Sequence, residues 1–152
     1  RSLIQQIGDW DITIKRNQEI DFHVRGLLAG AVYHYLPGVT GLWRTHEGER
    51  IFSKTNFSSA IAFYRKWEAV LKENGIWSTK FQKGFVSNYM WFIGNYPQSA
   101  EEEMMNLLKE VYRLEPAHPI FQSWKFRLVK STTGIHNALQ LWTRRFRKAG
   151  NV

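Results

Sequence analysis

The spacing of apolar residues in the first third of the chain is that of β-strands. Over residues 10–15 and 20–25, apolar and polar side chains alternate, a period of two that is typical of strands with one buried face. The Pro37-Gly38 pair is a strong turn signal. Shorter candidate strands lie at 32–36, 42–45 and 50–53. We therefore expect several short strands joined by turns before residue 57.

From Phe57 onward, apolar residues recur at spacings of three, four and seven, which is the pattern of a helix with one buried face. The pattern predicts three helices, over 58–73, 79–93 and 99–112. Asn74-Gly75 is a typical helix stop. Ser99 followed by Glu102 is the sequence of a capping box at the start of the third helix.

Alternation returns near the C-terminus, where Trp124, Phe126 and Leu128 are separated by basic residues. Residues 139–143 fit either a further strand or a short helix. Strands, then helices, then strands predict an α+β domain with a mostly antiparallel sheet and segregated helices. The length of 152 residues is that of one domain. Because the chain begins at Arg1, we expect that single domain, residues 1–152, to be a piece of a larger protein.

Charge and composition restrict the partners that this chain can have. It carries 21 Lys and Arg and 13 Asp and Glu, a net charge of +8, which favours phosphates or other acidic partners. Basic residues are concentrated at 144–148. The absence of Cys excludes disulfides and thiolate zinc sites and is usual for an intracellular protein. Residues 26–43 carry no formal charge, but the turn in their middle favours two buried strands over a membrane helix.

No enzymatic motif is present in the sequence. It has no Gly-rich phosphate loop and no G-x-S-x-G elbow. No two of the five His residues are spaced four apart, so we expect no metal site, no cofactor and no catalytic residues. Aromatic residues, however, stand beside basic ones along much of the chain. Because aromatic rings stack on nucleobases while basic neighbours hold phosphates, the sequence favours a binding domain over an enzyme.

Three short segments carry a resemblance to a known family. Residues 113–118 read RLEPAH, similar to an Arg-Leu-Asn-Pro-Met-His loop. Residues 60–66 read AIAFYRK, similar to an Ala-Thr-Ala-Ile-Leu-Arg-Lys helix, and residues 45–48 read THEG, similar to a Val-His-Glu-Gly turn. In sequence, order and spacing they resemble the cap-binding domain of the polymerase basic subunit 2 of orthomyxoviruses, the influenza relatives, and specifically a divergent genus other than influenza A.

The resemblance implies a set of residues that bind the 7-methylguanosine cap. Trp91 takes the place of a Phe that stacks on one face of the guanine, and His46 that of a hairpin ring on the other face. Lys66 matches a lysine that helps to hold the guanine, and His118 matches a His near the cap phosphates. Residues 32–38 are an alternative position for the hairpin.

At two positions the chain departs from the family pattern. Where the family has a carboxylate for the guanine edge, this chain has Arg50, with Glu49 beside it. Glu115 stands where the family has an Asn, which would bring a negative charge close to the cap phosphates. A buried guanine edge without its acceptor costs roughly 1–3 kcal/mol for each unmet group. We therefore expect weaker cap binding than in a family member that keeps the acid.

Three interpretations of function follow. The resemblance implies a module of a viral RNA-dependent RNA polymerase that binds the 5′ cap of host mRNA for cap-snatching transcription and does no chemistry itself. Its partners would be capped host mRNA and the other polymerase subunits, in the host nucleus and the virion, with no membrane. The second interpretation is a structural module of that polymerase with weak or absent cap binding. The residues alone also fit a third, a basic single-stranded RNA-binding domain.

Overall fold

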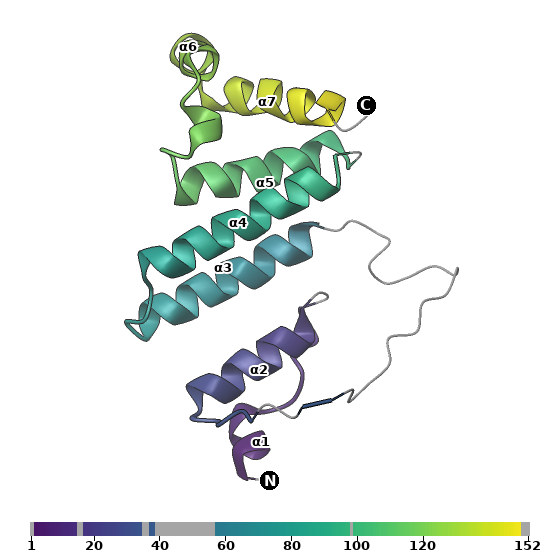
Figure 1. Cartoon of the computed structure of the whole chain (residues 1–152), viewed down its shortest axis with the longest axis vertical. Coiled ribbons are helices and arrows are strands. Elements are labelled where there is room, and N and C mark those ends of the chain that lie inside the picture. Colours follow the sequence, from purple (N-terminus) through teal and green to yellow (C-terminus); the bar gives the residue numbers. More distant parts are fainter. Residues whose placement is uncertain (1, 15–16, 35–36, 39–56, 98, 150–152) are drawn as a thin grey trace, which may run out of the picture. The chain divides into compact units, whose positions relative to one another are not determined.

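The regular secondary structure of the described residues is entirely helical. The structure is a computed structural model that describes residues 2–14, 17–34, 37–38, 57–97 and 99–149. The chain divides into two compact units, Arg1–Lys54 and Thr55–Val152 (Figure 1). Of the described residues, 74% are helical and none is in a strand. The expected α+β fold with a mostly antiparallel sheet is therefore wrong.

The first unit contains two short helices that are connected by hydrogen bonds from one arginine. These are α1 (Ser2–Ile7) and α2 (Gln18–Leu28). Arg25 of α2 donates from Nε to Oδ2 of Asp21 at 2.9 Å and from Nη2 to the carbonyl of Asp9 at 2.8 Å. It also donates to the carbonyl of Ile7, the last residue of α1. Asp21 is completely buried, so this guanidinium is the partner that its carboxylate requires.

The alternation at 10–15 marks a turn rather than a strand. The side chain of Asp11 accepts a hydrogen bond from the backbone N–H of Thr13 at 2.9 Å. This is the hydrogen bond of an Asx-turn, which competes with regular secondary structure. Ile14 is buried and Ile12 is 84% exposed. The local hydrogen bond of Asp11 thus overrides the pattern of side chains, and the strand expected here is wrong.

The alternation at 20–25 lies inside α2, so the strand expected there is also wrong. Asp21 and Arg25 are four residues apart, the spacing at which oppositely charged residues support a helix. Six residues cover less than two helical turns, and a run that short does not distinguish the strand period of two residues from the helix period of about 3.6. The described residues 32–34 are in neither helix nor strand. The strands expected at 42–45 and 50–53 lie outside the described residues.

The second unit is a layered set of helices (Figure 1). Its elements are α3 (Phe57–Glu73), α4 (Thr79–Asn95), α5 (Glu101–Leu114), the short 3-10 helix η2 (Pro119–Phe121), α6 (Trp124–Thr133) and α7 (Ile135–Ala149). α5 packs against α3, α4 and α7, and α6 packs against α7. The centre of the core is the apolar face of α5, formed by Met104, Met105, Leu107, Leu108, Val111 and Leu114.

The three helices predicted from the sequence after residue 57 are confirmed. α3, α4 and α5 begin and end within two residues of the predicted bounds. Gly75 follows α3 with φ +68°, a conformation that only glycine adopts without strain. The predicted capping box is wrong, because Ala100 is the N-cap of α5 and makes no side-chain hydrogen bond. The backbone N–H of Ser99 instead closes a turn on Tyr96 at 3.1 Å.

The strand expected at 124–130 is wrong because this segment is α6. The Ser123 hydroxyl accepts a hydrogen bond from the backbone N–H of Phe126 at 3.2 Å, which caps the helix. In a strand, Trp124, Phe126 and Leu128 would share one face, whereas here Phe126 is buried and the other two are exposed. Of the two structures that the sequence left open for 139–143, the helix is observed, as part of α7.

A network of charged residues joins α3 to α5. Arg113 donates to Glu68 of α3 at 2.9 Å and to Glu110 at 3.0 Å. Arg65 donates to Glu110 at 3.1 Å, and Lys72 donates to Glu68 at 2.6 Å. The hydrogen bond from Arg113, against the opposing effect of burial, lowers the pKa of Glu68 to about 2. Both carboxylates are buried and all three cations are partly exposed, so the cations cover the two acids from solvent.

Candidate nucleic-acid interface

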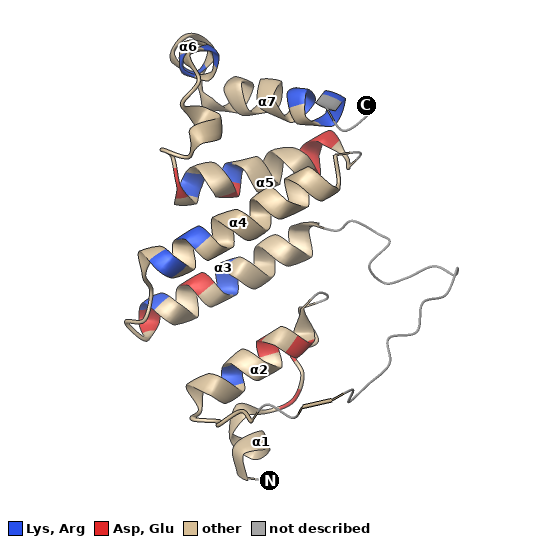
Figure 2. Ribbon diagram, viewed as in Figure 1, with Lys and Arg blue, Asp and Glu red and all other residues tan. Residues whose placement is uncertain are grey.

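A groove of about 880 Å³ lies beside the C-terminal end of α7. Its lining comes from α6, α7 and the loop between α4 and α5. It consists of five cationic residues, Lys125, Arg144, Arg145, Arg147 and Lys148, and three apolar residues, Pro97, Leu141 and Trp142. Figure 2 shows the basic residues of α7 gathered at its C-terminal end. So many cations around one groove create a positive potential that attracts anions.

Glu101, the first residue of α5, positions two of the five cations. Its carboxylate accepts from the side chain of Gln140 at 3.3 Å and from Nε of Arg144 at 3.2 Å, and it lies 3.6 Å from Nη1 of Arg147. The hydrogen bond from Gln140, followed by that from Arg144, lowers the pKa of Glu101. The arginine side chains remain 59% and 38% exposed. Since a guanidinium has five N–H donors, each keeps donors for a second anion.

The apolar part of the groove is built on a buried tryptophan. Trp142 is 4% exposed, and its indole N–H donates to the carbonyl of Ile120 at 2.9 Å. Its ring lies 5.1 Å from that of Phe126 between centroids. The guanidinium of Arg145 lies 5.8 Å from the Trp142 centroid, a cation–π distance. Leu141, nearly half exposed, adds an apolar patch beside the charges.

Sequence reasoning finds only part of this groove. The basic run at 144–148 is visible in the sequence as a local excess of charge. Lys125 and Pro97 lie far from it in the chain, and only the packing of α6 and α5 against α7 brings them to the same groove. The position of Lys125 could have been predicted from Ser123, a helix-capping residue that fixes the first turn of α6. The alternation of apolar and basic residues from Trp124 to Leu128 predicts a strand instead, and so hides this helix start.

Two of the predicted cap-binding residues lie at different levels of the α3–α4 pair. Trp91 is 53% exposed and contacts the rings of Phe92 and Tyr96. The rings of Phe57 and Phe92 are 5.5 Å apart, so Trp91 is level with the start of α3. Lys66 is nine residues further along α3 (66 − 57), or about 13 Å of helix. The structure therefore separates Trp91 from Lys66, and neither residue lines the basic groove.

The two remaining predicted residues that the structure describes, His118 and Glu115, do not line the groove either. His118 caps η2, where its Nδ1 accepts from the backbone N–H of Ile120 at 3.4 Å. Glu115 is the C-cap of α5, so it lies one helix length, about 20 Å, from Glu101 at the other end. Both side chains are partly exposed. The other three predicted residues, His46, Glu49 and Arg50, lie outside the described residues.

Comparison with protein-family models, with curated proteins and with solved structures found no match to this chain. Among the described residues, no three or more His, Asp or Glu side chains are grouped as metal ligands would be. None of the described helices is both long and apolar enough to cross a membrane. The convergence of five cationic side chains makes the basic groove the candidate site among the described residues.

Proposed function

We propose that this chain binds RNA, with the phosphate backbone in the basic groove of α6 and α7. The observation that carries the proposal is the convergence of five cationic side chains from two helices on one groove. Phosphate contacts supply most of the non-specific affinity of proteins for nucleic acids. The net charge of +8 adds long-range attraction to the same ligand.

The mixed lining of the groove supports a nucleotide ligand over a simple anion. A nucleotide presents both a charged phosphate and a flat apolar base. The groove offers cations beside the exposed Leu141 and the largely buried Trp142. A compact inorganic anion would be held as well by the cations alone and would gain nothing from the apolar residues.

Salt dependence gives a quantitative test of the proposal. Each phosphate contact on a single strand contributes about −0.7 to the slope of log affinity against log salt. Five contacts give a slope of about −3.5, which is roughly a 100-fold loss of affinity between about 50 and 200 mM salt. A fluorescent RNA of about 12 nucleotides, within the size that such grooves cover, is titrated by fluorescence anisotropy at several salt concentrations.

The double variant Arg145→Ala/Lys148→Ala removes two groove cations that do not contact Glu101. We expect it to reduce the slope by about 1.4 units, because two phosphate contacts are lost. The matched control is Lys80→Ala/Lys83→Ala, which removes the same charge from two exposed lysines of α4. Equal losses in the two double variants would show that net charge, and not the groove, holds the RNA. A DNA strand of the same sequence shows whether the sugar contributes.

Cap binding is a second proposal, and it is supported by one observation only. The α+β fold predicted from the sequence is wrong, but the ring of Trp91 is 53% exposed and is accessible to a base. A 7-methylated guanine is cationic and would stack on such a ring with a cation–π contribution. The test compares 7-methylguanosine triphosphate with guanosine triphosphate by calorimetry, on the parent chain and on Trp91→Ala. Equal affinity of the parent for both nucleotides would end this proposal.

A further inference from the structure

Trp124, at the start of α6, is exposed to a degree that packing does not explain. It is 69% exposed, whereas Trp67 and Trp142 of the same unit are 3% and 4% exposed. Tryptophan is normally kept for its large buried area, and Trp142 already fills that role between α6 and α7 through its contact with Phe126. The indole of Trp124 is therefore a large flat surface that is available to a ligand.

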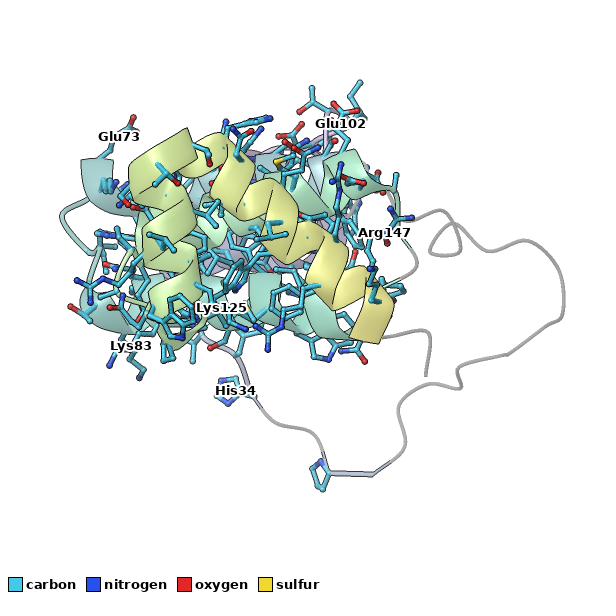
Figure 3. The ribbon with its side chains drawn as sticks, turned by 90° about the horizontal axis from the view of Figure 1, so that it is seen from above. His34, Glu73, Lys83, Glu102, Lys125 and Arg147 are labelled. Carbon is cyan, nitrogen blue, oxygen red and sulfur yellow. The ribbon has the colours of Figure 1, made fainter. Side chains whose placement is uncertain are left out.

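This surface adjoins the basic groove through the next residue. Lys125 lines the groove, and its Nζ lies 5.8 Å from the centre of the Trp124 ring. Figure 3 shows Lys125 extending from α6 and Arg147 near the C-terminal end of α7. The hydrogen bond from Phe126 N–H to Ser123 Oγ fixes the helical turn that holds Trp124 and Lys125. A phosphate on Lys125 would thus bring the base of the same nucleotide, or of its neighbour, to the Trp124 ring.

From this geometry we infer that Trp124 is a stacking platform, and that the groove selects single-stranded RNA over duplex. The inference rests on the proposed RNA binding and adds its substrate class. Bases of a single strand are free to stack on an aromatic ring, whereas those of a duplex are stacked on one another and paired. Leu128, one helical turn beyond Trp124 and 53% exposed, extends the apolar surface along α6.

The experiment measures the binding of three labelled ligands to the parent chain and to two variants. The ligands are a single-stranded RNA of about 12 nucleotides, the duplex of that sequence, and an abasic strand with the same number of phosphates. The variants are Trp124→Ala and Trp124→Phe. We expect Trp124→Ala to bind the single strand about 5- to 150-fold more weakly, the range that corresponds to one lost stack. Its affinity for the abasic strand should not change, and Trp124→Phe should restore most of the loss.

The outcomes separate this inference from the function on which it rests. If Arg145→Ala/Lys148→Ala weakens RNA binding but Trp124→Ala does not, the groove binds RNA and the stacking platform is refuted. If Trp124→Ala weakens the single strand and the abasic strand equally, the tryptophan supports the groove without stacking, and the inference is again refuted. If neither variant weakens RNA binding, the proposed function itself fails. Circular dichroism of each variant checks that helix content is unchanged.

Discussion

The charged network between α3 and α5 gives a prediction of pH-dependent stability. Glu68 is 6% exposed and accepts hydrogen bonds from Arg113 and Lys72. The substitution Glu68→Gln keeps the volume of the side chain and removes its charge. Arg113 retains Glu110 as a partner at 3.0 Å, so the variant does not strand a buried cation. The change in stability therefore reports on the charge of Glu68.

The size and sign of the effect follow from the pKa of Glu68, which is lowered from 4.5 to about 2. A shift of that size corresponds to roughly 3 kcal/mol. The cationic side chains are 41% and 53% exposed, and solvent screening reduces the contribution to about 1–2 kcal/mol. A lowered folded pKa stabilises the protein above the unfolded pKa. That contribution is lost as the pH falls from about 4.5 towards 2.

Urea denaturation followed by circular dichroism measures the difference between the parent and Glu68→Gln. We expect the variant to be about 1–2 kcal/mol less stable at neutral pH, and the difference to shrink steadily between about pH 5 and pH 3. The control is Glu73→Gln at the exposed end of α3, labelled in Figure 3, which should change stability by less than about 0.5 kcal/mol. A difference for Glu68→Gln that stayed constant over this pH range would contradict the electrostatic explanation.

Two further predictions concern single positions in the second unit. Gly75 has φ +68°, and no neighbouring atom lies within 4 Å of the position that a Cβ would take. Gly75→Ala should therefore lower the free energy of unfolding by about 1–2 kcal/mol through backbone strain alone. An unchanged melting temperature would refute this. Tyr89 is fully buried, and its hydroxyl has no hydrogen-bond partner among the described residues. Tyr89→Phe should therefore raise stability by about 1–3 kcal/mol, and a destabilised variant in urea denaturation would reveal a partner for the hydroxyl.

The helices of the second unit could be predicted where the apolar pattern is long. α3, α4 and α5 each extend over 14 residues or more, so their buried faces repeat over several turns and exclude the strand period. The predicted strands are short runs of about four to seven residues, too few to separate the two periods. In α6, the helix is specified by the Ser123 cap and not by a continuous apolar stripe. There, the local hydrogen bond decides the structure.

The candidate site is harder to predict than the helices because it combines distant segments. The sequence shows an excess of cationic residues at 144–148, but it does not show which other residues they face. Lys125 joins them only because α6 packs against α7. The role of Glu101 is also hidden in the sequence: an acidic residue at a helix start indicates a favourable interaction with the helix dipole, yet its carboxylate binds Arg144. A contact over 43 positions in the sequence is set by tertiary packing.

The order in which the helices of the second unit contact one another also bears on how quickly this unit folds. α4 packs against α5, and α6 against α7, so these pairs are neighbours in sequence. Domains rich in local contacts of this kind fold on the microsecond to millisecond timescale. The contacts of α5 with α3 and with α7 join helices that are not adjacent in the sequence. Because the basic groove takes its lining from α6, α7 and the α4–α5 loop, a chain in which α7 had not packed against α5 would have its helices but no binding groove.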